Sequence, residues 1–231
     1  MPHRQRVPLT LATQAIPPIC MRPDNTALLI QDMQYSLVDP AFGLGRAARE
    51  RGIPMEFQPY YEQAKSIIGN IARLKARMTD AGMPTIYSRL AHEAGEHPSR
   101  LQRALGLTDA ALEQESQVVS ALEPGDEDVI LCRRGFDAFN DTRLREILGE
   151  MGIENLVLTG VITEFGIRSS AATAQDFGFH PLVVSDATAS MTYETQSRTL
   201  GEISYGLTKV RSTGELMVYL DEMMQTGVKV I

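Results

Sequence analysis

The sequence has little cysteine, no excess of positive charge and no long apolar run. Its two cysteines, Cys20 and Cys132, are too few for the disulfide framework of a secreted protein. The formal net charge of -7 is the opposite of the basic footprint that nucleic-acid binding needs. No segment reaches the roughly 18 uninterrupted apolar residues of a membrane span, and residues 1–18 lack an apolar run of signal-peptide length. We therefore expect a cytoplasmic protein that binds neither nucleic acid nor a membrane.

The length of the chain and the placement of proline indicate one domain that follows an arm. A chain of 231 residues fits one large domain better than two, and it buries enough surface to fold without a disulfide or a metal. Residues 1–25 are rich in proline, which opposes regular helix. We expect these residues to form an N-terminal arm that is mobile or wraps a neighbour, and residues 26–231 to form the domain.

Short apolar runs alternate with segments of helical periodicity along this domain. Strands are predicted at 27–30, 84–88, 129–132, 156–161, 181–185 and 209–212, and helices at 60–81, 142–151, 164–177, 192–205 and 213–224. We expect the helix caps to be Asp141 or Thr142, then Thr192, then Thr213. Residues 40–57 are rich in Gly and Arg and are expected to form an irregular excursion or lid. The alternation predicts an α/β fold, a three-layer αβα sandwich around a mostly parallel six-stranded sheet.

Several polar residues follow the predicted strands, where ligands of such sheets bind. Asp32 ends the first strand, and partial desolvation there would raise its pKa and suit a proton-transfer role; the alternative is a structural Asp that caps a turn. Arg133 and Arg134 end the third strand. They either pair with Asp32, bind a substrate carboxylate or carry a solvated charge.

Cys132 precedes Arg133, whose charge would favour a thiolate. Successive side chains of a strand point to opposite faces, however, so Cys132 and Arg133 would not share a site. A buried, inert cysteine is therefore the better interpretation, and a relocated nucleophile is the alternative.

Three segments together resemble the isochorismatase-like (cysteine hydrolase) family, over residues 26–222. They lie at 27–34, 133–144 and 156–166, and the last is continued at 171–176 and 183–187. The resemblance implies the same α/β fold. It places the Asp of the family's Asp-Lys-Cys triad at Asp32, the Lys position at Arg133 and the nucleophilic Cys position at Gly166. Without a thiol at this position, the family's covalent route is excluded there.

The resemblance also implies a backbone site for an anion. In the family a cis peptide follows the fourth strand, here between Val161 and Ile162, and amides near the start of the next helix form an oxyanion site, here at 162–166. Family members with glycine at the Cys position include the isochorismatases, which cleave a vinyl ether without a thiol but retain the lysine. This chain therefore matches neither subgroup of the family.

Further contacts of the site are expected around these positions. We expect the substrate to be bound by Gln34, Arg89, Arg134, Phe139, Ile162 and Phe165. Some family members hold a metal with an Asp and two histidines near the second strand, and His92, Glu93, Glu96 and His97 resemble such a cluster. Because Ser88 and Arg89 stand where that Asp would lie, we expect no metal, and we expect no other cofactor. Family members are usually homo-oligomers, which we expect here as well.

Three functions remain open. The first is hydrolysis of a small anionic molecule without a cysteine nucleophile, with Asp32 as acid and base, Arg133 as the substrate contact and the 162–166 amides as an anion cradle. The second is a catalytically inactive family member that serves as a binding module or partner subunit. The third is an amide or ureide hydrolase with a displaced nucleophile such as Cys132.

Overall fold

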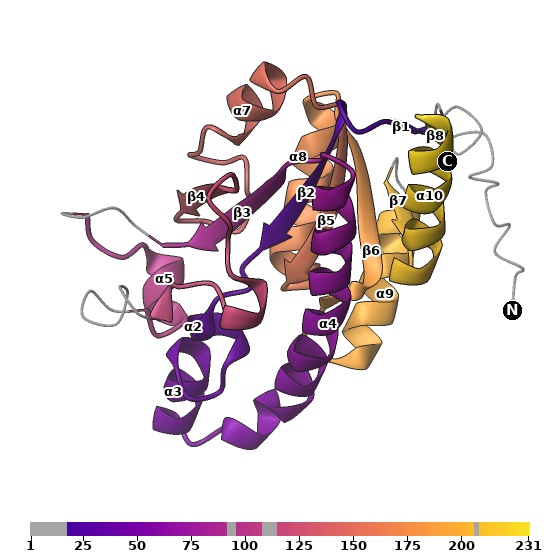
Figure 1. Ribbon diagram of the computed structural model, residues 1–231. Helices are drawn as coiled ribbons and strands as arrows, with labels where there is room; N and C mark the ends of the chain where they lie inside the picture. The colour runs from indigo at the N-terminus through magenta and orange to yellow at the C-terminus, as the bar shows by residue number, and fades with distance from the viewer. Residues whose placement is uncertain (1–17, 92–95, 108–114, 206–207) are drawn as a thin grey trace, which may run out of the picture.

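The computed structural model describes residues 18–91, 96–107, 115–205 and 208–231. Its centre is a six-stranded sheet in the order β4-β3-β2-β5-β6-β7, with every neighbouring pair parallel (Figure 1). The strands are β2 (Thr26–Gln31), β3 (Thr85–Leu90), β4 (Val129–Arg133), β5 (Asn155–Val161), β6 (His180–Ala189) and β7 (Lys209–Arg211). The predicted parallel six-stranded sheet is confirmed, and β6 is longer than the run at 181–185 indicated.

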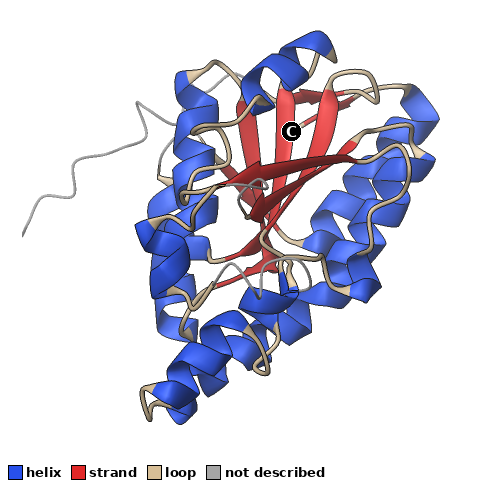
Figure 2. Cartoon of the chain, turned by 90° about the vertical axis from the view of Figure 1, so that its left-hand side faces the viewer, coloured by secondary structure: helices blue, strands red, loops and turns tan. Residues whose placement is uncertain are grey.

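The strands send alternate side chains into two apolar cores, one on each face of the sheet. On β2, Leu28 and Ile30 belong to one core, whereas Ala27 and Leu29 belong to the other. The first core is covered by α4 (Gln58–Asp80) and α10 (Thr213–Thr226). The second is covered by α7 (Leu144–Glu150), α8 (Arg168–Asp176) and α9 (Tyr193–Ser204). Figure 2 shows the strands between the two layers of helices, which confirms the αβα sandwich.

The helix caps agree with the sequence at one position and differ at two. Thr192 caps α9 by accepting a hydrogen bond from the Thr195 amide. The cap of α10 is Ser212, not Thr213, because the Thr213 hydroxyl donates to Asp186 while Ser212 forms a capping box with Glu215. The helix expected from 142 begins later: α7 starts at Leu144 after Arg143, which makes no side-chain cap.

The prediction of an irregular excursion at 40–57 was wrong. After α2 (Tyr35–Val38), this segment contains α3 (Gly43–Glu50) and a 3-10 turn, η1 (Pro54–Phe57). Leu44, Ala47 and Ala48 form the buried face of α3. A Cβ at Gly43 would overlap the backbone of Ser36, so glycine permits the close packing of α3 on α2. The high glycine content thus reflects close packing of backbones, not irregular structure.

Between the strands predicted at 84–88 and 129–132, where no element was predicted, the structure has α5 (Arg100–Ala104) and a 3-10 turn, η2 (Ser120–Leu122). Ser99 begins α5 with a capping box, since its side chain accepts from the Gln102 amide and the Gln102 side chain accepts from the Ser99 amide. η2 packs against α4, and the Leu122 carbonyl in it accepts a hydrogen bond from the Tyr87 hydroxyl of β3 at 2.7 Å.

The described part of the expected arm packs on the domain. β1 (Cys20–Met21) pairs antiparallel with β8 (Lys229–Val230), and Ile19 and Ile231 exchange backbone hydrogen bonds of 3.1 and 2.8 Å. Ile19 and Met21 are buried in the first core. Residues 1–17 lie outside the described residues. Among the described helices, none has the length and hydrophobicity that crossing a membrane requires.

Candidate active site

Asp32 follows β2 directly and leaves the sheet with an unusual backbone conformation. Its φ is 59°, in the left-handed region that Asp and Asn tolerate better than other residues with a side chain. Its amide still donates to the Ser88 carbonyl, at 2.9 Å, so the main chain remains tied to β3. The residue is only 6% exposed. The carboxyl group is therefore held at the end of the central strands, away from bulk water.

Arg133 is the last residue of β4 and is buried against this carboxylate. Its Nη2 donates to Oδ2 of Asp32, its Nη1 donates to the Gly135 carbonyl, and its Nε donates to Oγ of Ser88 at 2.9 Å. Arg133 is thus oriented by the protein and forms the ion pair with Asp32.

Burial raises the pKa of Asp32 from an ordinary 3.8 to about 6. The charge and hydrogen bond of Arg133 oppose this rise but do not cancel it. The second carboxylate oxygen, Oδ1, is buried and has no hydrogen-bond partner at ordinary distance among the described residues, although the Leu90 amide and the Gln31 side chain lie close enough to lower the pKa of Asp32. A carboxyl group with a pKa near neutrality and an unoccupied oxygen is suited to give and take a proton.

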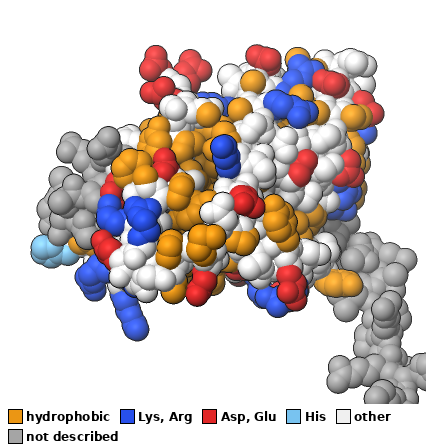
Figure 3. Space-filling view, turned by 90° about the horizontal axis from the view of Figure 1, so that it is seen from below, with side chains coloured by type: hydrophobic (Ala, Val, Ile, Leu, Met, Phe, Trp, Pro, Cys, Tyr) orange, Lys and Arg blue, Asp and Glu red, His pale blue; other side chains and the backbone are white. Residues whose placement is uncertain are grey.

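A cavity of about 190 Å³ lies beside the carboxyl group of Asp32. Its apolar wall is formed by Leu37, Leu90, Leu101, Leu105, Phe136, Ile162, Phe165 and Met191. Asp32 and Arg133 are the only charged side chains among the described residues that line it. The rings of Phe136 and Phe165 stack with centroids 5.1 Å apart. Hydrophobic side chains gather on this end of the molecule, which Figure 3 shows from below. The volume and lining fit a small molecule with an apolar body and a polar or charged group that faces Asp32 and Arg133.

The chain after β5 brings Gly166 to the same cavity. The peptide bond between Val161 and Ile162 is cis, as the resemblance implies. A π-helical turn, η3 (Thr163–Ile167), follows and continues into α8. The Ile162 carbonyl accepts from the Phe165 and Ile167 amides, at 3.1 and 3.4 Å. Gly166 is buried and lines the cavity with Asp32 and Arg133. The three positions of the family triad thus meet at one cavity, which Ile162 and Phe165 also line.

Gln34, Arg134 and Phe139, which the sequence assigned to substrate binding, do not line this cavity. Gln34 is fully buried, donates to the Leu90 carbonyl at 3.1 Å and accepts from the Leu90 amide at 2.8 Å. Arg134 donates to the His97 carbonyl at 2.9 Å. Phe139 belongs to the second core. In the structure these side chains support the surroundings of the site.

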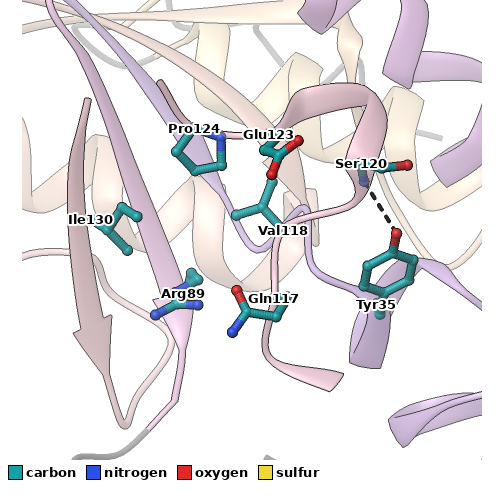
Figure 4. A pocket seen from close by; sticks show the side chains of 8 residues that line it. All are labelled: Tyr35, Arg89, Gln117, Val118, Ser120, Glu123, Pro124 and Ile130. Atoms are coloured by element: carbon teal, nitrogen blue, oxygen red, sulfur yellow. Dashed lines mark hydrogen bonds between the residues drawn. The ribbon is translucent and has the colours of Figure 1, made fainter. Parts of the chain in front are cut away.

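Arg89 faces a second cavity, of about 350 Å³, on the other side of the sheet edge (Figure 4). Its Nη1 donates to the Ser116 carbonyl at 3.3 Å, and its Nη2 lies 3.6 Å from Sγ of Cys132. Strand alternation explains this separation, because Ser88 and Arg133 face Asp32 whereas Arg89 and Cys132 face the opposite side. Arg89 and Cys132 are thus separated from the Asp32 cavity.

The sequence did not identify several residues that the structure brings to the site. They are Gln31, Leu37, Ser88, Leu90, Leu101, Leu105, Phe136 and Met191. Two signals were present: Met191 follows the carboxyl end of β6, and the Ser99-to-Gln102 capping box marks the helix that carries Leu101. No sequence signal places Gln31 or Phe136.

No cluster of three or more His, Cys, Asp and Glu side chains in the described part of the chain could hold a metal ion. Two members of the group considered from the sequence, His92 and Glu93, lie outside the described residues.

Comparisons with known sequences agree with this arrangement. A family model described as the isochorismatase domain matches residues 26–215. An uncharacterized isochorismatase family protein, YecD of Escherichia coli O157:H7, is 26% identical over 195 residues, which are 84% of this chain and 95% of that protein. Isochorismatase of Bacillus subtilis (strain 168) is 28% identical over 185 residues, or 77% of this chain and 52% of that protein. Enterobactin synthase component B of Escherichia coli (strain K12) is 28% identical over 198 residues, or 84% and 63%. The chain thus spans between half and two thirds of the length of the last two relatives.

Solved structures share the fold. A cysteine hydrolase from Pseudomonas syringae pv. phaseolicola 1448A superposes with a TM-score of 0.74 at 21% identity, covering 87% of this chain and 95% of that one. N-carbamoylsarcosine amidase from Thermoplasma acidophilum gives a TM-score of 0.64 at 22% identity, covering 82% and 96%. At these identities the solved structures show a shared fold and no more. Because the isochorismatase domain model matches most of this chain, the chain belongs to the isochorismatase family of hydrolases.

Proposed function

We propose that the chain hydrolyses a small molecule with Asp32 as acid and base and without a thiol nucleophile. The observation that carries this proposal is the state of Asp32 in the cavity. It is a buried carboxyl group with a pKa of about 6, one oxygen without a hydrogen-bond partner among the described residues, and a side-chain-free position at Gly166 on the same cavity.

A vinyl ether is the bond that suits this set of groups. Protonation of its vinyl carbon by Asp32 makes the adjoining carbon electrophilic, so that water adds without a covalent enzyme intermediate. The ionised Asp32 takes the proton from the water, which leaves a hemiketal. The hemiketal then breaks its C–O bond to the alcohol: its hydroxyl gives up a proton, the departing alcohol oxygen gains one, and a carbonyl compound and an alcohol result. Backbone amides at 162–166 other than that of Phe165, which donates to the Ile162 carbonyl, would bind a negative charge carried by the substrate. The relatives named isochorismatase support this choice of bond, since the family resemblance connects that name with vinyl-ether cleavage.

The charge of Arg133 supports an anionic substrate. When Asp32 is protonated, the charge of Arg133 is no longer balanced in an otherwise apolar cavity, and a substrate carboxylate would restore the balance. When Asp32 is ionised, it already neutralises Arg133. Binding of an anion and protonation of Asp32 therefore favour each other, which would prepare the acid in the complex that needs it.

The alternative in which Cys132 acts as a displaced nucleophile is disfavoured by its position. Its Sγ lies beside Arg89 on the face away from Asp32, and Cys132 is not among the cavity-lining residues. A nucleophile must lie within hydrogen-bond reach of its base and near the reacting atom. No feature of the described residues provides this for Cys132.

The experiment compares isochorismate, a carboxamide and a ureide as substrates, with product formation followed by chromatography. The wild-type chain is expected to cleave the vinyl ether, and Asp32→Asn is expected to lower its rate by a factor of roughly 100 or more. Asp221→Asn, which removes an Asp–Arg pair at the surface, serves as the matched control and should leave the rate unchanged. Iodoacetamide should have no effect.

Three results would contradict the proposal. Turnover that survives in Asp32→Asn would remove the acid from the mechanism. Inactivation by iodoacetamide that Cys132→Ser prevents would show a thiol enzyme. Binding of an anionic ligand without turnover of any of the three substrates would indicate a binding module.

A further inference from the structure

Gln31, the last residue of β2, has a fully buried side chain held by two hydrogen bonds. Its Nε2 donates to the Phe136 carbonyl at 2.8 Å, and its Oε1 accepts from the Ser170 hydroxyl at 2.9 Å. The oxygen of Ser170 in turn accepts from the Ala138 amide at 2.8 Å. The Phe136 carbonyl can only accept, so these bonds fix which end of the Gln31 amide faces which partner. Moving the side chain would leave buried polar groups unpaired, which is costly.

This amide occupies the space that a side chain at position 166 would need. A Cβ built on Gly166 would overlap Nε2 of Gln31, and it would lie 3.3 Å from the Phe136 carbonyl oxygen. A side chain whose end made no hydrogen bonds could rotate away from a new Cβ at little cost in free energy. The Gln31 amide cannot do so without breaking its bonds to Phe136 and Ser170.

The main chain of Gln31 is fixed as well. Gln31 pairs with Gly160 across β2 and β5, and a Cβ on Gly160 would overlap the Gln31 carbonyl. The two central strands therefore approach closely at this point because Gly160 has no side chain. Gln31 has no room to withdraw from Gly166 by a shift of the backbone.

We propose that Gln31 is a positioning residue, coupled to Gly166, whose side-chain amide occupies the space that a nucleophile at position 166 would need. A merely structural role would not change the acid: because the Gln31 amide also lies close enough to lower the pKa of Asp32, Gln31→Ala should shift the pH profile of turnover to higher pH, and an unchanged profile would refute the positioning role. The inference rests on the proposed function and deepens it. The pair confines the site to bonds that acid and water cleave, such as vinyl ethers. It excludes carboxamides and ureides that require an acyl-enzyme formed on a side chain at position 166.

A double-mutant cycle read by thermal unfolding tests the coupling. Gly166→Cys and the smaller Gly166→Ala are each made alone and together with Gln31→Ala. The matched controls are Gly201→Cys and Gly201→Ala, because a Cβ at Gly201, in α9, meets nothing within 4 Å. We expect each substitution at Gly166 to lower the unfolding temperature by roughly 5 °C or more relative to its control. We expect most of this loss to vanish in the Gln31→Ala background, since the overlap is then removed.

The Gly166→Ala arm keeps the test decisive if Gly166→Cys does not fold, since the Cβ alone makes the overlap. The proposal is overturned if the Gly166 variants unfold at the temperatures of their Gly201 controls, or if their effects simply add to that of Gln31→Ala. Since the readout of the cycle is unfolding and not turnover, an additive result would refute the coupling and leave Asp32 chemistry intact. Failure of the Asp32 experiment would leave the coupling to be judged on its own.

Discussion

Asp32→Asn should remove activity and, at neutral pH, stabilise the fold. The side chain is 6% exposed, and burial outweighs the attraction of Arg133. Asparagine has nearly the same shape, carries no charge and tolerates the φ of 59° at this position. The substitution therefore removes a buried charge with little change in packing or in the backbone.

The magnitude follows from the pKa of Asp32. A rise from 3.8 to about 6 corresponds to about 3 kcal/mol, since a tenfold change in proton affinity is worth about 1.4 kcal/mol. Because this pKa is higher in the folded state than in the unfolded chain, the folded state holds the proton more tightly. The stability contributed by Asp32 is therefore fully present below pH about 4 and is lost as the pH rises to about 6. At pH 8 we expect the free energy of unfolding of Asp32→Asn to exceed that of the wild type by up to about 3 kcal/mol. This difference should shrink toward zero near pH 4.

The opposite result has a physical basis too, because breaking a buried ion pair commonly costs about 3–5 kcal/mol when the remaining charge is left unpaired. Arg133 retains bonds to Ser88 and Gly135, which lowers this cost. The measurement is the free energy of unfolding in urea at pH 5 and pH 8, with Asp221→Asn, a surface pair, as the control. A loss of about 3 kcal/mol or more at pH 8 in Asp32→Asn would refute the reasoning.

Three further outcomes are expected. Arg133→Met removes the charge that lowers the pKa of Asp32, so a carboxyl titration followed by NMR should give a pKa above about 6; an unchanged pKa would show that the pair is not coupled. The affinity for benzoate, measured by calorimetry, should rise by up to about tenfold per pH unit as the pH falls toward about 6, because benzoate binds beside Arg133 when Asp32 is protonated. An affinity that does not change with pH would show that the benzoate carboxylate binds away from Asp32. Tyr60→Phe should leave the free energy of unfolding unchanged or raise it by about 1 kcal/mol, because the buried Tyr60 hydroxyl has no hydrogen-bond partner among the described residues. Tyr87→Phe, the control, loses a 2.7 Å hydrogen bond to the Leu122 carbonyl and should lower the free energy of unfolding by about 1 kcal/mol. Equal effects of the two substitutions would contradict this assignment.

The strands and the carboxyl end of the sheet were predictable because their signals are local. Central strands buried on both faces read as continuous apolar runs, as Ala27 to Ile30 do. A residue at the end of such a run lies at the edge of the sheet where ligands bind, which suffices to place Asp32 there, whereas the family resemblance is what points to Gly166.

The direction of individual side chains was not predictable in the same way. Arg89 and Ser88 are neighbours at the end of one strand, and only the tertiary structure shows that Ser88 is the one that contacts Arg133. Gln34 was expected to bind substrate, but its amide is used by the backbone of Leu90. The role of Gln31 was not predictable, because it depends on hydrogen bonds with Phe136 and Ser170, which are distant in the sequence. Long-range hydrogen bonds of this kind leave no local periodicity.

The pairing of β1 with β8 makes the first and last described strands a single unit of stability. The backbone bonds between Ile19 and Ile231 close the chain into a near-ring, so neither end can fray without releasing the other. Release would also uncover Ile19 and Met21, which are buried in the core under α10. In hydrogen exchange, the amides of Ile19 and Ile231 would consequently lose protection together, in one cooperative opening.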